Sequence, residues 1–185
     1  MDVQTDPWYV HAGLYLVIAI LTVLLVKIAI IDPHDYVETE KYNKKESRLR
    51  MTNLKEAQML WERKYDNYSG NIDALIEFIK SDPFVDSVVN AFDSLIMKPA
   101  NPFKPLLSGK FVPDSLKWSP KSHSVYILQI DTSVVIDTVI NRRGKITRVD
   151  TTITFGTRYY LEDIDGYGTI GSLDTDALKN TASWE

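Results

Sequence analysis

The chain has 185 residues and a formal net charge of −4 at pH 7, with acidic and basic residues mixed along its length. A nucleic-acid-binding surface needs lysine and arginine clustered on one face, so no nucleic-acid partner is expected. The chain has no cysteine, which excludes disulfides, thiolate nucleophiles, iron–sulfur sites and cysteine-based zinc sites.

An apolar run near the N-terminus extends from Ala12 to Val26 and, past Lys27, to Ile31. A helix needs about 20 mostly apolar residues to cross a bilayer, so residues 9–31 are predicted to form a single transmembrane helix. A secretory signal peptide would have a basic start and a small-residue cleavage site after the run. The tail, residues 1–8, has no lysine or arginine, and no such site follows, so we expect an uncleaved membrane anchor.

The orientation of this anchor stays open on sequence grounds. Basic residues follow the apolar run and none precedes it, which by the positive-inside rule favours a cytoplasmic C-terminal domain. The rule is weak for long domains, and acidic residues are interspersed with the basic ones between positions 32 and 50. We expect a single-pass protein of the inner (cytoplasmic) membrane whose soluble domain faces away from the cytoplasm, with the cytoplasmic side as the alternative.

A charged juxtamembrane helix is predicted to follow the anchor at residues 32–66. Pro33 is expected to end or kink the membrane helix, because the residue before a proline avoids the helical region. The apolar residues of the charged segment fall near one face of a 3.6-residue period, at Met51, Leu54, Trp61 and Tyr65. Its alternating charges are typical of a solvated helix surface.

Two shorter helices are predicted at the start of the soluble domain, which comprises residues 67–185. Asn71 is expected to cap the first helix, which carries an apolar stripe. Asp82 is an N-cap candidate followed by Pro83 at the first helical position, so the second helix is predicted to run from there to about Lys98. The proline-rich stretch that follows is predicted to be an irregular connection.

The residue pattern changes to an alternation of period two after Ser122. Strands are predicted at residues 125–130, 133–140, 145–155 and 158–162, with a polar turn joining the middle two. The soluble part is therefore predicted to be α+β, with helices first and a small antiparallel β-sheet after them.

The polar C-terminal loop is the best candidate for a binding site, because it combines several aspartates with glycines. Calcium takes six to eight oxygen ligands, often on backbone that glycine allows to turn tightly. One interpretation is therefore a calcium site formed by Asp163, Asp165, Asp174 and Asp176. The alternative is a glycine-rich turn whose aspartates accept local backbone hydrogen bonds. The EF-hand pattern is not met.

Signatures of catalysis are absent from the sequence. The chain contains neither a G-x-S-x-G nucleophile elbow nor a phosphate-binding glycine loop. We therefore expect neither an enzyme nor a small-molecule substrate, and calcium is the one cofactor under consideration.

Two stretches of the chain resemble type IV pilins and the pseudopilins of type II secretion. Residues 54–79 are similar to the region where the long pilin helix ends in a tyrosine, a polar turn and a second tyrosine before a short leucine-containing helix. Residues 165–184 are similar to the end of the major pseudopilins, where a D-G loop and a late aspartate bind calcium shortly before a terminal tryptophan. The resemblance implies a pilin-like fold and a calcium role for the four aspartates.

The processing motif of that family is absent, because the residues before Gly13 are not basic and Ile18 stands where a processed helix has glutamate. We therefore expect a non-enzymatic structural or assembly component of a cell-envelope machine, such as a secretion or pilus-like apparatus. Its expected partners are the lipid bilayer and the proteins of that complex. The alternatives are an accessory subunit of a respiratory or transport assembly and a calcium-binding sensor.

Overall fold

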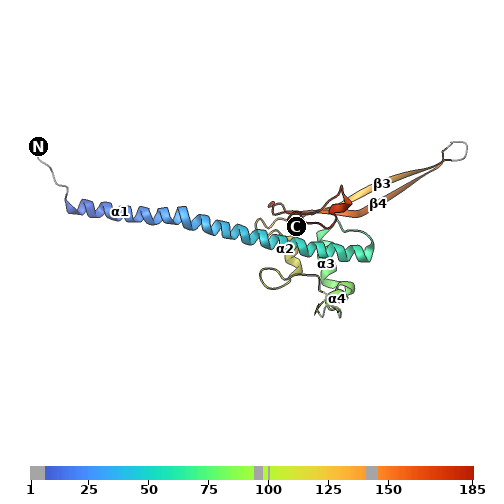
Figure 1. Cartoon of the computed structure of the whole chain (residues 1–185), viewed down its shortest axis with the longest axis horizontal. Helices are drawn as coiled ribbons and strands as arrows, with labels where there is room; N and C mark the ends of the chain where they lie inside the picture. The colour runs from blue at the N-terminus through green and yellow to red at the C-terminus, as the bar shows by residue number, and fades with distance from the viewer. Residues whose placement is uncertain (1–6, 94–97, 100, 141–145) are drawn as a thin grey trace. The chain divides into compact units, whose positions relative to one another are not determined.

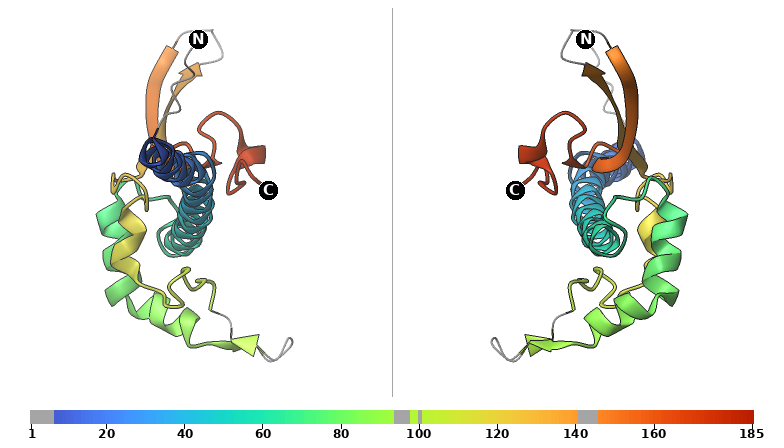
Figure 2. Two further views of the ribbon diagram at one scale, coloured as in Figure 1. Left: turned by 90° about the vertical axis from the view of Figure 1, so that its left-hand side faces the viewer. Right: turned by 90° about the vertical axis from the view of Figure 1, so that its right-hand side faces the viewer.

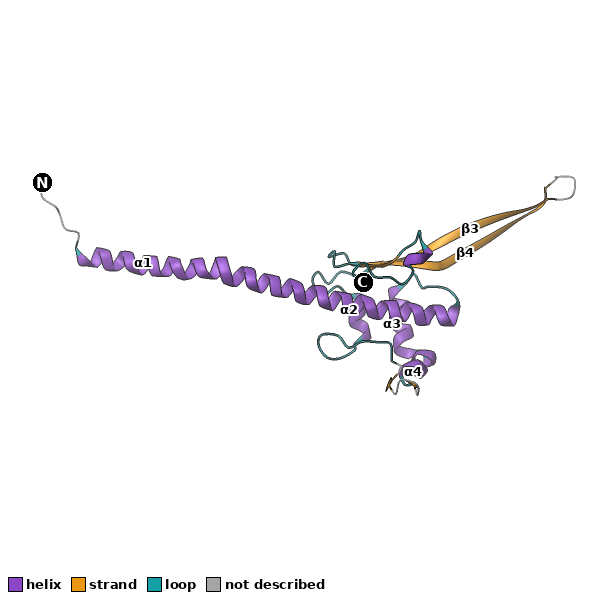
Figure 3. Ribbon diagram, viewed as in Figure 1, coloured by secondary structure: helices purple, strands orange, loops and turns teal. Residues whose placement is uncertain are grey.

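The computed structural model describes residues 7–93, 98–99, 101–140 and 146–185 of the chain. The chain divides into two compact units, Met1–Asn43 and Lys44–Glu185, and the boundary falls within helix α2 (Asp32–Tyr65). Helices come first along the chain and most of the strand residues come after them (Figure 3). This is the α+β layout predicted from the sequence, with a small antiparallel sheet following the helices.

Helix α1 (Trp8–Val26) is followed without interruption by a π-helical segment, η1 (Lys27–Ile31), and then by α2 (Figure 1). Pro33 is the second residue of α2. Proline lacks an amide hydrogen, and its ring clashes with the carbonyl four residues earlier, so the wider turn of a π-helix accommodates it. The sequence predicted that Pro33 would either end or kink the helix. The structure shows that Pro33 does not end it.

The apolar part of this helix is long and apolar enough to cross a membrane. It is the only helix of this kind in the described part of the chain, and it lies near the N-terminus. None of the side chains of α1 is buried by the rest of the protein. By length and composition, α1 with η1 is therefore a candidate for a single membrane-spanning segment.

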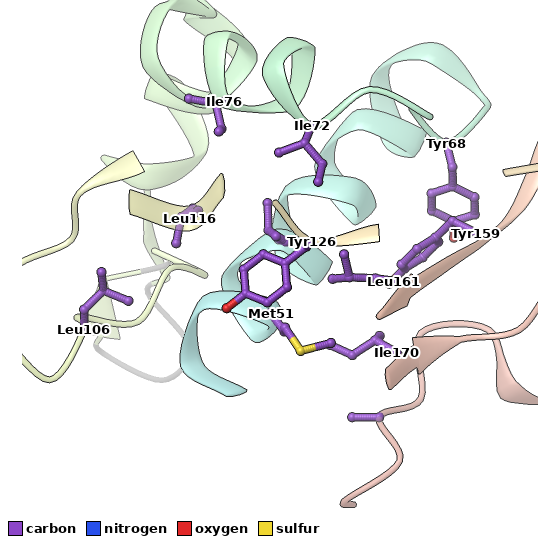
Figure 4. Close-up of a cluster of buried hydrophobic side chains, with 12 residues drawn as sticks. Met51, Tyr68, Ile72, Ile76, Leu106, Leu116, Tyr126, Tyr159, Leu161 and Ile170 are labelled. Atoms are coloured by element: carbon purple, nitrogen blue, oxygen red, sulfur yellow. The ribbon is translucent and has the colours of Figure 1, made fainter. Parts of the chain in front are cut away.

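The second half of α2 runs through the middle of the Lys44–Glu185 unit. The sheet and the helices α3 (Ile72–Ser81) and α4 (Pro83–Val89) lie on different sides of it (Figures 1 and 2). Met51 and Leu54 belong to one buried cluster that includes residues of the sheet (Figure 4). Ala57 and Leu60 belong to a second cluster with residues of α3 and α4. This half of α2 is therefore the centre of the hydrophobic core.

The predicted caps of the two short helices are confirmed. The side chain of Asn71 accepts hydrogen bonds from the first backbone amides of α3, and the side chain of Asp82 accepts one from Phe84 at the start of α4. The predicted end of the second helix is wrong, because α4 ends at Val89. Strands β1 (Phe92–Asp93) and β2 (Lys98–Pro99) pair where that helix was expected to continue.

A three-stranded antiparallel sheet contains β3 (Ile127–Ile140), β4 (Ile146–Glu162) and β5 (Thr169–Gly171), in the order β3-β4-β5. The four predicted strands merge into β3 and β4, with a shift in register after Ile130. Strand β5 was not predicted. The predicted turn at residues 141–144 lies outside the described residues.

The turn after α2 attaches this helix to the sheet. The backbone amide of Tyr68 donates a hydrogen bond to the carbonyl of Gly156 (2.7 Å), and the rings of Tyr68 and Tyr159 lie 4.8 Å apart. Gly156 has a φ of 71°, and a side chain at this position would overlap the backbone of Tyr68. A glycine in β4 therefore permits the close approach of helix turn and sheet.

Candidate functional site

The loop that follows β4 contains Asp163 and Asp165, two of the four predicted calcium ligands. Hydrogen bonds from the Gly166 amide to the Asp163 carbonyl (3.0 Å) and from the Asp163 amide to the Gly168 carbonyl (3.2 Å) close the loop. The Asp165 amide also donates to Oδ1 of Asp163 (2.9 Å). Gly166 has a φ of 77°, which a glycine adopts without strain. The local turn chemistry therefore brings these two aspartates together.

The carboxylate of Asp163 points into the protein rather than into solvent. Asp163 is 1% exposed, and its Oδ2 accepts a hydrogen bond from the hydroxyl of Ser47 on α2. The Ser47 hydroxyl also lies 3.0 Å from the hydroxyl of Tyr126. Burial raises the pKa of Tyr126 well above its ordinary value, partly opposed by the hydrogen bond to Ser47. Asp163 therefore joins the loop to the centre of α2.

The carboxylate of Asp165 binds a different segment. Its Oδ2 accepts hydrogen bonds from the Ser119 hydroxyl (2.5 Å), the Ser122 hydroxyl (2.9 Å) and the Ser122 amide (3.1 Å). Burial alone would raise the pKa of Asp165, but these hydrogen bonds to the charged form outweigh it and lower the pKa below the usual value. Asp165 therefore holds the segment before β3 as an ionised carboxylate.

The other two predicted ligands, Asp174 and Asp176, lie after β5 and are exposed. The carboxylate of Asp176 accepts a hydrogen bond from Nε of Arg158 (2.6 Å), and Arg158 also donates to the carbonyl of Leu173. Within the described residues, no group of three or more histidine, aspartate or glutamate side chains is arranged to hold a metal ion. The four-aspartate calcium site stays a prediction.

The C-terminal residues pack against the same stretch of α2. Arg48 donates a hydrogen bond from Nε to the carbonyl of Tyr167 (3.1 Å), and its guanidinium lies 5.0 Å from the ring centre of Trp184. A side chain at Gly168 would overlap the Trp184 ring, so glycine is required for this contact. Together, Ser47 and Arg48 fasten both the aspartate loop and the terminal tryptophan to one turn of α2.

Sequence reasoning missed a set of buried polar residues on α2, namely Glu46, Asn53 and Gln58. Asn53 pairs with the backbone of Lys104 through two hydrogen bonds of 2.9 and 2.8 Å, and Gln58 pairs in the same way with Ser69. Glu46 accepts from the amide of Leu107 (2.9 Å) and forms an ion pair with Arg50. In the sequence, the signal that could have identified these residues as buried was their position beside the apolar stripe of the helix.

A groove of about 620 Å³ lies between α3, α4 and residues 101–113. Its apolar lining includes Phe103 and Phe111, whose rings stack at 4.8 Å, and its polar lining includes Lys80, Asp82 and Asp86. None of the four predicted calcium ligands lies in it. Asp86 is exposed, and the other two charged side chains pair with residues outside the groove, Lys80 with Asp114 and Asp82 with Lys64.

Comparison of the chain with protein families, with curated proteins and with solved structures gives no match. The arrangement described above is that of a clasp, which we define as Ser47, Arg48, Ser119, Asp163 and Asp165. Its contacts attach the aspartate loop to α2 through Ser47 and Arg48, and to the segment before β3 through Ser119.

Proposed function

We propose that the chain is a single-pass, membrane-anchored structural or assembly component of a cell-envelope machine, such as a secretion or pilus-like apparatus, and that it is not an enzyme. One observation carries this proposal. Residues Trp8–Tyr65 form one continuous helix, whose start is apolar enough for a membrane and whose end is the core of the folded unit. A single helix that is apolar enough to span a membrane at its start and forms the core of a folded unit at its end supports a role in holding that unit at a membrane.

The way α2 ends supports a pilin-like form of this role. The helix stops at Tyr65, a polar turn follows, and Tyr68 then packs into the core before the short helix α3. The D-G loop and Trp184 lie against the same helix through Ser47 and Arg48. Both stretches that resemble pseudopilins in sequence therefore belong to one structural neighbourhood.

The use of the polar side chains supports a non-enzymatic role. Ser47 and Ser119 each donate a hydrogen bond to an aspartate of the clasp, and these serines are 0% and 1% exposed, so neither serine–carboxylate pair faces a space that could hold a substrate. Catalysis by general acid–base or nucleophilic chemistry needs such a pair near a substrate site.

Topology reporters test the envelope-facing part of the proposal. A reporter fused after Glu185 that is active only outside the cytoplasm should give a signal, and a reporter that is active only in the cytoplasm should not. The reverse result would overturn the envelope-facing proposal and favour the accessory-subunit alternative, which the basic residues after the anchor support.

A calcium-binding role is a second candidate, favoured by the pairing of Asp163 and Asp165 on a glycine turn. A ligand that binds only the folded chain must stabilise it. The full-length chain in detergent should therefore melt at a higher temperature in calcium than in a chelator, and the Asp163→Asn chain should not show this difference. An unchanged melting temperature in saturating calcium would remove this candidate.

A further inference from the structure

The end of the Lys44–Glu185 unit at which α2 enters combines the first turns of this part of the helix with three loops. Glu46 accepts a hydrogen bond from the amide of Leu107 (2.9 Å). Nη1 of Arg50 donates to the carbonyl of Trp118 (2.6 Å). The aspartate loop is fastened to the same stretch of α2 by the clasp. We call this end the entry surface and define it by residues 44–50, 104–110, 118–124 and 163–168.

The entry surface is basic, although the unit as a whole is neutral. The unit contains 19 basic and 19 acidic residues, whereas the entry surface contains seven basic residues and three acidic ones. These three acidic residues, Glu46, Asp163 and Asp165, are buried or half-buried and accept hydrogen bonds from within the unit. The excess of positive charge at this end is therefore balanced by an equal excess of negative charge over the rest of the unit.

The lysines of the entry surface also differ from the other lysines of the unit in their partners. Every lysine outside this surface whose side chain the structure describes forms an ion pair with a carboxylate: Lys55, Lys64, Lys80, Lys117 and Lys179. Among the described residues, no such pair involves the exposed entry-surface lysines Lys44, Lys45, Lys104 and Lys110. These four ammonium groups therefore remain available to an anion outside the chain.

Two large apolar side chains are exposed on the same surface. Trp118, next to Arg50, is 42% exposed, and Ile164, between the two aspartates of the loop, is 53% exposed. Tryptophan favours the headgroup region of a bilayer, because its ring is apolar and carries one polar N–H group. Lysines together with exposed apolar side chains bind an anionic membrane both by charge and by apolar contact.

The anchor limits how far the entry surface can lie from a bilayer. Residues 32–43 of α2 connect the apolar segment to the unit, and this length of helix spans about 18 Å. A surface on so short a tether meets the membrane at a high effective concentration, so individually weak contacts are sufficient. An anionic bilayer would also repel the acidic remainder of the unit, which favours the entry surface as the side that meets it.

From these observations we infer that the entry surface binds the anionic lipid headgroups of the bilayer that holds the anchor. Lys44, Lys45 and Lys110 supply the positive charge, and Trp118 enters the headgroup region beside them. The inference rests on the membrane anchoring in the proposed function and names the lipid class that the folded unit contacts. It applies to either orientation of the chain, because it depends only on the charge of the leaflet on the side of the unit.

The absence of native cysteine allows a single dye to be attached at an introduced position. Ser108→Cys places a donor dye on the exposed turn that Glu46 holds, in the full-length chain reconstituted into liposomes with a trace of headgroup-labelled acceptor lipid. Energy transfer should be higher in liposomes with one third phosphatidylglycerol than in phosphatidylcholine alone. The excess should disappear in about 1 M salt, where the screening length is about 3 Å. Equal transfer in the two lipid mixtures would overturn the inference.

Charge reversals distinguish this surface from a general effect of charge. In the labelled chain, Lys45→Glu and Lys110→Glu, each alone, should reduce the phosphatidylglycerol-dependent excess by about twofold or more. Arg63→Glu is the matched control, because Arg63 is exposed near the other end of α2 and its reversal changes the net charge equally. An equal reduction in this control would overturn the inference. Co-flotation with phosphatidylcholine vesicles tests the anchoring separately, so an absent lipid-dependent excess would leave that part of the proposed function standing.

Discussion

Replacement of Gln58 tests how much α2 stabilises the turn that follows it through buried hydrogen bonds to Ser69. Its side chain is fully buried, and Nε2 donates to the Ser69 carbonyl (2.7 Å) while Oε1 accepts from the Ser69 amide (3.0 Å). Gln58→Leu keeps a similar volume but leaves both buried Ser69 groups unpaired, at about 1–3 kcal/mol each. Burial of the leucine offsets about 2 kcal/mol. The expected net loss in the free energy of unfolding is therefore about 2 kcal/mol.

The assay is urea unfolding of the full-length chain in detergent, followed by tryptophan fluorescence. Arg63→Gln is the control, because Arg63 is an exposed residue near the end of the same helix, and its replacement should change the free energy by less than about 0.5 kcal/mol. A Gln58→Leu chain as stable as this control would refute the reasoning. It would mean that the Ser69 groups are satisfied without α2.

The remaining predictions concern the clasp and the sheet. Ser47→Ala should destabilise the chain by about 1–3 kcal/mol in the same urea assay, because Asp163 loses its hydroxyl donor. In thermal melts, Gly171→Ala should be far more destabilising than Gly109→Ala. Both glycines have a φ near 80°, but only a side chain at position 171 would overlap the backbone of β4. Because folding lowers the pKa of Asp165, this carboxylate contributes to the free energy of unfolding. That contribution is complete above the ordinary pKa of aspartate and is lost as the pH falls through the lowered pKa. Asp165→Asn should therefore flatten the loss of stability between about pH 5 and 2 in urea titrations.

Features specified by neighbouring residues were predictable. The Asn71 cap and the Asp82–Pro83 start depend on side chains that bind amides two or three residues away, so a short sequence window contains the whole interaction. The alternation after Ser122 similarly predicted this region to be strand, although as four strands where the structure has two long ones, β3 and β4. The α+β class follows from these local signals in their order along the chain.

Features decided by distant contacts were not predictable from the pattern. The pairing of Phe92–Asp93 with Lys98–Pro99 replaces the helical continuation that was expected after Val89. The last two residues of α4, Val88 and Val89, are β-branched and therefore weak helix formers. Strand β5 has three residues and exists through its pairing with residues 160–162 of β4. A three-residue strand carries too few alternating positions to be detected in a single sequence.

The aspartate loop illustrates the same division within the candidate site. Its turn was expected from the glycines. The hydrogen bond from the Asp165 amide to Asp163 is the kind of local backbone contact that the interpretation as a glycine-rich turn predicts. The partners of its carboxylates were not foreseeable, because Ser47 is 116 residues from Asp163 and Ser119 is 46 residues from Asp165. Spacing along the chain therefore identified the loop but not what its charges bind.

The buried polar residues of α2 show why an apolar stripe is an incomplete description of a core helix. Irregular segments have backbone groups without a partner in a helix or sheet, and such groups must be satisfied when they are buried. Glu46, Asn53 and Gln58 bind segments of this kind, at Leu107, Lys104 and Ser69 respectively. A polar residue in the buried phase of a helix therefore indicates an irregular segment packed against it. In this chain, three such residues fix the positions of two irregular stretches around α2, whereas apolar contacts, which are not directional, would leave those positions less defined.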